Sequence, residues 1–170
     1  MIVLGVAPGL SELAYSVLAC YPDAVLVDPI DADVLHGGRG GPPASVIALQ
    51  RRTHVHHMIL GLVFERHTPA LVVLGPASKT NEPDEHVNGV RMLLRVIAEG
   101  VRVPVIELPD KLDMIAALGA DQRSWRRSVD DRLREPISHD RRIVLATATA
   151  LAGLNTFRRR SALTGDYPAC

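Results

Sequence analysis

The chain has 170 residues, which is enough for one domain with a sizeable buried core. Its 19 basic and 19 acidic residues cancel, so any attraction to nucleic acid must come from local clustering of charge. The two cysteines, Cys20 and Cys170, have no metal-type spacing and indicate neither a disulfide framework nor a zinc site. No apolar run reaches membrane-spanning length and no cleavable leader is recognisable, so we expect a cytoplasmic protein without a membrane partner.

The N-terminal part of the chain is predicted to contain strands. Ile2–Gly9 is a continuous apolar run that ends in a Pro-Gly turn, which is typical of a central strand buried on both faces. The next segment, Leu10–Cys20, fits either a second strand or a helix capped by Ser11. Ala24–Val27 is then predicted to be a short buried strand that ends at a turn beginning with Asp28.

The rest of the chain alternates helical and strand patterns. His36–Pro43 is rich in Gly and Pro and is expected to be an exposed loop. After this loop, the hydrophobic pattern predicts, in order, a helix over Ala44–His67, a strand over Ala70–Leu74, a helix over Asp84–Glu99, a strand over Val103–Leu108, and helices over Lys111–Leu118, Asp121–Leu133 and Asp140–Phe157. This order indicates an α/β fold with helices on both sides of a mixed sheet, formed by one domain of residues 1–157. We expect residues 158–170 to be a basic, disordered tail.

The first turn also allows a nucleotide-binding interpretation. Gly5 and Gly9, followed by a helix and a strand that ends at Asp28, would imitate a βαβ unit with an acid about 20 residues on for the ribose. Only two glycines are present, however, and Pro8 lacks the backbone N–H that a phosphate cradle needs. We keep a nucleotide-binding protein as an alternative.

Val3–Leu10 reads Val-Leu-Gly-Val-Ala-Pro-Gly-Leu. It is similar to I-L-G-I-D-P-G, the first strand of the RuvC-type Holliday junction resolvases of the ribonuclease H-like superfamily. The resemblance continues in the right order along the chain. The other similar segments are His67–Gly75, Gly89–Val90, Val103–Glu107, Gly119–Arg123 and Asp140–Thr149. The resemblance implies a ribonuclease H-like fold, a five-stranded mixed sheet whose first three strands are antiparallel, with Leu10–Ala19 as the second strand.

The same resemblance implies chemistry that these residues do not supply. Enzymes of this type hydrolyse phosphodiesters with two Mg²⁺ ions held by carboxylates. The four family carboxylates fall on Ala7, Gly75, Asp140 and Ile143, so only Asp140 remains as an acid. One carboxylate offsets little of the repulsion between two divalent cations. We therefore predict no catalytic metal centre and no cofactor, with Asp140 either a vestigial ligand or a helix-start acid favoured by the helix dipole.

Displaced acids are the alternative that would restore an active Mg²⁺-dependent endodeoxyribonuclease. We expect the candidates to be solvated loop and helix-start residues instead; they are Asp28, Glu82, Asp84, Glu85 and Glu107. Other chemistry has little support. The histidines of the predicted long helix lack a further ligand, and the isolated serines lack a nucleophile-elbow pattern; these residues are His54, His56, His57, Ser11, Ser45 and Ser78.

Arginines gather around the only tryptophan, close to the last two predicted helices. Guanidinium groups suit phosphate geometry, and an exposed tryptophan would stack on a base. The candidate nucleic-acid contacts are Arg123, Trp125, Arg126, Arg127, Arg141 and Arg142. Acids interleaved with them fit surface ion pairs equally well.

The segment Asn88–Ile97 carries more apolar perimeter than one buried stripe needs. The resemblance implies a homodimer around this helix, with Val90, Leu93, Leu94 and Ile97 at the interface, although burial within the monomer fits the pattern as well. We expect a dimeric RuvC-like protein that has lost cleavage and binds branched or duplex DNA, or acts as a scaffold.

Overall fold

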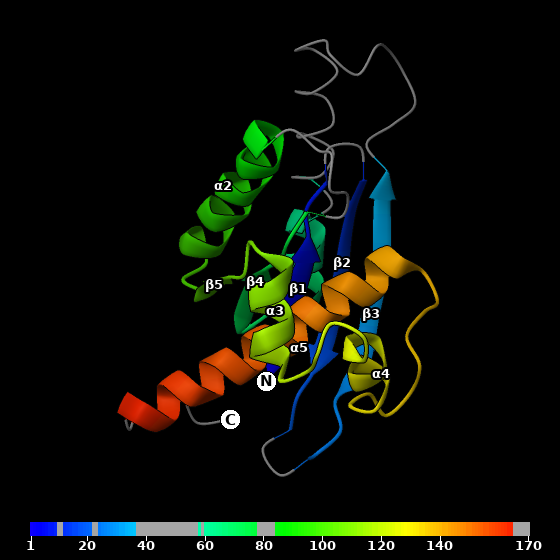
Figure 1. Ribbon diagram of the computed structural model, residues 1–170. Helices are drawn as coiled ribbons and strands as arrows, with labels where there is room; N and C mark the ends of the chain where they lie inside the picture. The colour runs from blue at the N-terminus through cyan, green and yellow to red at the C-terminus, as the bar shows by residue number, and fades with distance from the viewer. Residues whose placement is uncertain (10–11, 22–23, 37–57, 59, 78–83, 165–170) are drawn as a thin grey trace.

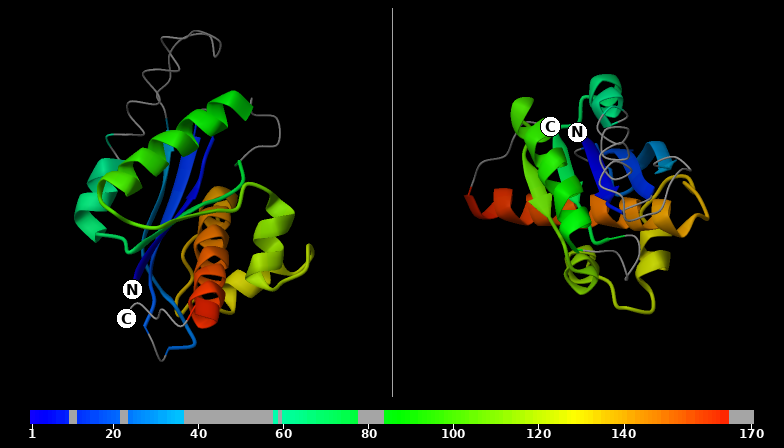
Figure 2. Two further views of the ribbon diagram at one scale, coloured as in Figure 1. Left: turned by 90° about the vertical axis from the view of Figure 1, so that its left-hand side faces the viewer. Right: turned by 90° about the horizontal axis from the view of Figure 1, so that it is seen from above.

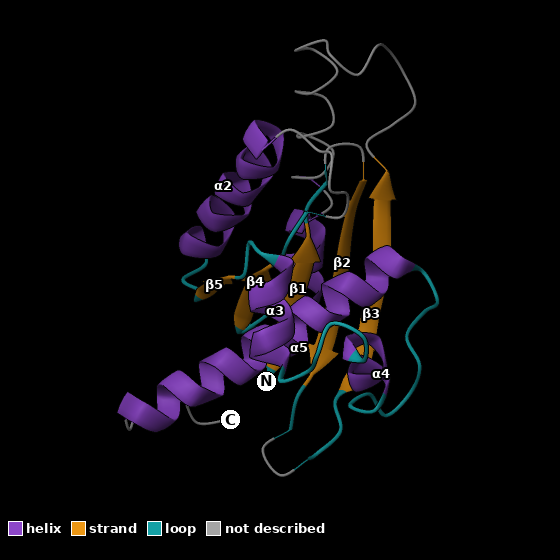
Figure 3. Cartoon of the chain, viewed as in Figure 1, coloured by secondary structure: helices purple, strands orange, loops and turns teal. Residues whose placement is uncertain are grey.

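The computed structural model describes residues 1–9, 12–21, 24–36, 58, 60–77 and 84–164, and these contain a five-stranded sheet in the order β3-β2-β1-β4-β5. β1 (Ile2–Ala7), β2 (Glu12–Ala19) and β3 (Asp28–His36) pair antiparallel, whereas β4 (Leu71–Leu74) runs parallel to β1 and to β5 (Val105–Glu107) (Figure 3). The predicted mixed sheet, with its first three strands antiparallel, is confirmed.

β2 decides between the two interpretations of the first turn. It returns along β1 from Ala14, opposite Ala7, to Ala19, opposite Ile2. Tyr15 and its neighbours on one face of β2 and Ala14 and its neighbours on the other are all buried, because both faces of the sheet are covered. No helix separates β1 from β2, so the nucleotide-binding βαβ interpretation is wrong.

β3 differs from the prediction. The strand expected over Ala24–Val27 is absent there, and β3 begins at Asp28 and continues through Pro29. Proline is tolerated because β3 is the edge strand of the sheet, where a missing N–H breaks no ladder bond on the outer side. The β2–β3 register shifts at this point, and Ile30 is the extra residue of the resulting irregularity.

Helices cover both faces of the sheet (Figure 2). A helix whose described part includes residues 60–67, together with α2 (Asp84–Gly100), lies on one face. α3 (Lys111–Leu118), α4 (Trp125–Asp130) and α5 (Arg141–Thr164) lie on the other. The predicted helix over Ala44–His67 is confirmed where it is described, whereas its first part and most of the loop before it lie outside the described residues.

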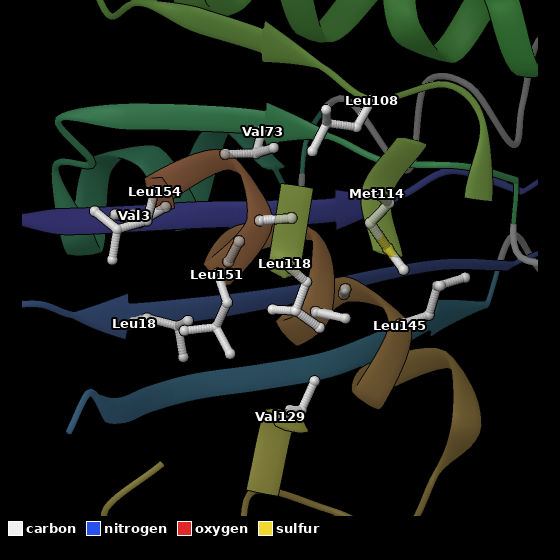
Figure 4. Packing of buried hydrophobic residues seen from close by; sticks show 14 of the residues in the cluster. Val3, Leu18, Val73, Leu108, Met114, Leu118, Val129, Leu145, Leu151 and Leu154 are labelled. Atoms are coloured by element: carbon white, nitrogen blue, oxygen red, sulfur yellow. The ribbon is translucent and has the colours of Figure 1, made fainter. Parts of the chain in front are cut away.

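α5 forms the main core with the sheet on one side and α3 and α4 on the other (Figure 4). Val3, Leu18 and Val73 of the sheet belong to this core, as do Leu151 and Leu154 of α5. Small residues bring the helix very close to the strands: a Cβ built on strand residue Gly5 would lie 2.7 Å from that of Ala150 on α5. The helix therefore fits the sheet without space for larger side chains at these contacts.

The last helix is longer than predicted. α5 continues past Phe157 to Thr164, so residues 158–164, expected to be part of a disordered tail, are helical. Arg158, Arg159 and Arg160 are exposed, but Ser161 is only 9% exposed and holds this turn against the rest of the chain. Within the described residues, no helix is both long and apolar enough to cross a bilayer.

Candidate functional site

The edge of the sheet formed by the carboxyl ends of the central strands β1 and β4 corresponds to the metal centre implied by the resemblance. Ala7 is the last residue of β1, and Gly75 follows β4 directly. The Gly75 N–H donates to the carbonyl of Val6 at 2.8 Å, so the two positions are neighbours. α5 crosses the strands here (Figure 1), and Ile143 packs against the same core that buries Ala7. The fold thus places Ala7 and Gly75 side by side, with Ile143 in the first turn of α5 and Asp140 directly before that helix.

The Gly75 position is filled by α5. A Cβ on Gly75 would overlap Thr149 Oγ1 and would lie 2.8 Å from Thr149 Cγ2 and 3.0 Å from Thr149 Cβ. Thr149 is fully buried, and its hydroxyl donates to the carbonyl of Leu145 at 2.9 Å. A glutamate side chain at position 75 would therefore require Thr149 or α5 to move.

The one remaining family acid, Asp140, is held by an arginine. Asp140 Oδ2 accepts from Arg142 Nη2 at 2.6 Å, and Oδ1 accepts from Arg142 Nε at 3.0 Å and from the Arg142 backbone N–H at 2.8 Å. These hydrogen bonds lower the pKa of Asp140 to about 2. Both carboxylate oxygens are thus directed at a guanidinium group.

The same guanidinium joins α5 to the sheet. Arg142 Nη1 lies 2.6 Å from Glu12 Oε2 at the start of β2, and Glu12 Oε1 lies 3.5 Å from Nδ1 of His36. Neither Glu12 nor this role of Arg142 was predicted from the sequence. Residues two apart do not face each other in a regular helix, and the pair forms only because Asp140 precedes the first residue of α5.

The residues at this edge do not fit a pair of Mg²⁺ ions. Mg²⁺ requires oxygen ligands in near-octahedral geometry. The four positions offer a buried methyl group, a glycine covered by Thr149, an isoleucine and a carboxylate already paired with Arg142. In the part of the chain that is described, no group of three or more His, Cys, Asp or Glu side chains is placed to hold a metal ion.

Two of the acids considered as replacements are paired elsewhere. Glu107 Oε1 accepts from Arg95 Nε at 3.1 Å, and Asp28 Oδ1 lies 3.0 Å from Arg134 Nε. The other candidates lie outside the description: Glu82 is not among the described residues, nor are the side chains of Asp84 and Glu85. The same holds for His54, His56, His57, Ser11, Ser45 and Ser78.

The tryptophan expected on the surface is buried. Trp125 is 6% exposed and packs in the core with Val129, because the two residues lie four apart on the same face of the short α4 and anchor it. Its ring lies 5.5 Å from Lys111 Nζ and 5.4 Å from Arg126 Cζ. The expectation that Trp125 is exposed for stacking on a base is therefore wrong.

The candidate arginines divide into two groups. Arg142 is committed to Asp140 and Glu12, and Arg127 lies 4.0 Å from Asp131 across one turn. Arg123, Arg126 and Arg141 have exposed side chains. Among the described residues, none of these three arginines forms an ion pair with a carboxylate.

The predicted interface residues of α2 also divide. Leu94 is fully buried within the chain and cannot contact a partner, so this assignment is wrong, whereas Leu93 and Ile97 are half-buried. The side chain of Val90 lies outside the description. The apolar surface of α2 is instead formed by Met92 and Val96, which are 68% and 61% exposed.

No family model and no curated protein sequence matches the chain. Its structure is similar to that of Thermus thermophilus RuvC, with a TM-score of 0.77 and 21% identity over 94% of this chain and 97% of that one. The same protein in complex with a Holliday junction substrate gives a TM-score of 0.72 at 21% identity, over 94% and 96% of the two chains. The yeast mitochondrial Holliday junction resolvase Ydc2 gives 0.60 at 11% identity, over 96% and 83%.

The chain has the RuvC fold. This confirms the architecture that the ordered segments from Met1 to Phe157 implied, including β2 as a strand. The RuvC fold of this chain nevertheless carries an alanine, a glycine and an isoleucine at three of the positions on which the family acids fall.

Proposed function

We propose that this chain is a RuvC-like protein that has lost phosphodiester cleavage and binds branched DNA as a homodimer. The single observation that carries the loss of cleavage is the contact between Asp140 and Arg142. A guanidinium group occupies both oxygens of the one acid left at the family positions, so a metal ion would have to displace a fixed positive charge.

The packing of α5 supports the same proposal. In a two-metal site the ligands must surround the ions from several sides. Thr149 lies where a side chain on Gly75 would extend, and the buried methyl of Ala7 faces the core that α5 forms. Restoring the centre would require several substitutions and a shift of the helix.

Binding of branched DNA is supported by two of the structural neighbours. Thermus thermophilus RuvC and the fowlpox virus resolvase both have structures with Holliday junction DNA, and the latter matches this chain with a TM-score of 0.52 at 13% identity. Arg123, Arg126 and Arg141 supply exposed guanidinium groups for phosphate contacts.

A homodimer is supported by apolar side chains exposed on one face of the molecule. Met92 and Val96 of α2 are exposed, and Met58 and Leu62, from the helical segment on the same face of the sheet, are 57% and 60% exposed. Apolar side chains exposed on helices that cover the same face of the sheet can supply a protein–protein interface.

The test is a mobility-shift and cleavage experiment with a four-way junction and a duplex of the same arm sequence, each with and without Mg²⁺. We expect the junction to be shifted in both conditions and to remain uncut on a denaturing gel. Asp140→Asn is the matched variant, because asparagine keeps a side-chain acceptor before α5 but removes the charge.

The alternative is an active endodeoxyribonuclease that uses displaced acids. Junction cleavage that requires Mg²⁺ and disappears in Asp140→Asn would establish that alternative and refute the loss of cleavage. Cleavage that persists unchanged in Asp140→Asn would also refute the loss of cleavage, and it would show that the metal ligands lie elsewhere. Absence of any shift with either DNA would refute DNA binding.

A further inference from the structure

We propose that the pocket between α4 and the start of α5 is a binding site for one phosphate group, and that its source is the DNA backbone. This proposal rests on the proposed function only in taking DNA as the source of the phosphate. α4 lies beside the N-terminal end of α5 (Figures 1 and 2). The pocket has a volume of about 170 Å³ and is lined by Arg126, Asp130, Ser138, His139, Arg141 and Val144.

The charges of this pocket favour an anion. Arg126 comes from α4 and Arg141 from the first position of α5, so two arginines from different elements line the same pocket. Asp130 offsets one of these charges. Arg95, Arg134 and Arg142 each form an ion pair with a carboxylate. Among the described residues, no such ion pair to a carboxylate is found for Arg126 or Arg141. Two arginines that line one pocket and are not engaged in such pairs can offer their guanidinium donors to the oxygens of a phosphate group.

The neighbouring groups add position and hydrogen-bond donors. The ring of Trp125 lies 5.4 Å from Arg126 Cζ, and this contact restricts the guanidinium before a ligand arrives. The hydroxyl of Ser138 accepts the Asp140 N–H at 3.0 Å, which leaves its own proton for a ligand. The ring of His139 supplies a further N–H donor at the rim.

The size of the pocket selects the kind of ligand. Sites that enclose whole organic ligands have volumes of about 300–1,000 Å³. A pocket of about 170 Å³ is below that range and has room for a phosphate group but not for a nucleoside. The site is also separate from the family metal positions, because Asp140 faces Arg142 and is not part of its lining.

The experiment has a DNA arm and a free-phosphate arm. Junction affinity is measured against KCl concentration for the wild type, Arg126→Gln, Arg141→Gln, the double variant, and Arg127→Gln as the control on the same helix. Because each phosphate contact contributes about 0.9 to the slope of log K against log salt, each pocket variant should reduce the slope by about one. The double variant should lose little more than a single variant, since both side chains bind the same phosphate. Arg127→Gln should keep the slope.

The second arm records the melting temperature in inorganic phosphate and in KCl at equal ionic strength. A phosphate-dependent rise in the wild type that is absent from the double variant indicates occupation of the pocket. If the junction binds and the slopes of all variants equal that of the wild type, the pocket proposal is overturned while DNA binding stands. If the junction does not bind, the proposed function fails, and the second arm decides the pocket: the rise supports a site for free phosphate, and its absence overturns it.

Discussion

Gly75→Ala measures directly how closely α5 is packed against the end of β4, where the resemblance implies an acid. The added methyl would overlap Thr149 Oγ1 and lie 2.8 Å from Thr149 Cγ2, and Thr149 is fully buried beside Met114. Gly75 does not have a positive φ, so its backbone accepts alanine and the whole penalty is steric. Overpacking of this kind costs about 1–3 kcal/mol, and we expect about 2 kcal/mol here because Thr149 has little room to move. For a domain of this size that lowers the melting temperature by roughly 4–8 °C.

A double-mutant cycle with Thr149→Ala isolates the contact. Thr149→Ala alone should cost about 1 kcal/mol, mainly for the lost buried methyl. In the Thr149→Ala background the two nearest atoms are gone, so Gly75→Ala should cost less than about 1 kcal/mol there, and a coupling of at least about 1 kcal/mol follows.

Urea unfolding followed by circular dichroism provides the free energies of this cycle. Gly89→Ala is the control, because it adds the same methyl to a glycine of α2 with nothing within 4 Å and should stabilise the chain by about 0.5–1 kcal/mol. Additive costs for Gly75→Ala and Thr149→Ala, or a Gly75→Ala variant as stable as Gly89→Ala, would refute the close packing of α5 at this edge.

Three further predictions concern charge, ionisation and assembly. Because hydrogen bonds from Arg142 lower the pKa of Asp140 from 3.8 to about 2, its contribution to stability is present above about pH 4 and is lost as the pH falls toward 2. After allowance for solvent screening, thermal unfolding should show Asp140→Asn about 1 kcal/mol less stable at pH 6 and equal to the wild type at pH 2; a constant difference would be inconsistent with this pairing. Burial, with the negative charges of Asp31 and Asp33, raises the pKa of Tyr15 from 10.0 to about 12. The folded state therefore favours the neutral phenol, and the stability that this provides is present below pH 10 and is lost as the pH rises from 10 to about 12. Absorbance at 295 nm should show one late-titrating tyrosine that Tyr15→Phe removes, and titration of every tyrosine near pH 10 in the folded protein would count against this environment. Met92→Glu should convert the proposed homodimer to a monomer in sedimentation velocity without loss of stability, whereas Leu112→Glu on α3, at a side chain that is 55% exposed, should not; a wild type that is already monomeric would refute the proposed dimer.

The parts of the fold that sequence could predict are those buried on both faces. The strands at Ile2–Gly9 and Ala70–Leu74 are continuous apolar runs because helices cover both sides of the sheet. β3 could not be found in this way, since an edge strand that contains Pro29, Asp31 and Asp33 has neither apolar continuity nor β-forming composition. Its position follows from pairing with β2, which is a tertiary effect.

In the candidate site, too, the sequence could predict some features, whereas others depend on contacts between distant segments. The prediction that Ala7, Gly75 and Ile143 supply no carboxylate needs only the sequence, because it depends on the resemblance and on the chemistry of each side chain. The contact of Thr149 with Gly75 could not be predicted, since it joins distant segments of the chain. The burial of Trp125 did have a signal, its spacing of four residues from Val129, but the surrounding arginines favoured an exposed interpretation.

Anomalous scattering from crystals of the protein soaked in Mn²⁺ would show whether paired metal ions bind where β1 and β4 end. Mn²⁺ accepts the same oxygen ligands as Mg²⁺. We expect no paired anomalous peaks between Ala7 and the start of α5, with Arg142 still hydrogen-bonded to both oxygens of Asp140. Two well-occupied ions at this edge, with Asp140 turned away from Arg142 toward them, would contradict this expectation.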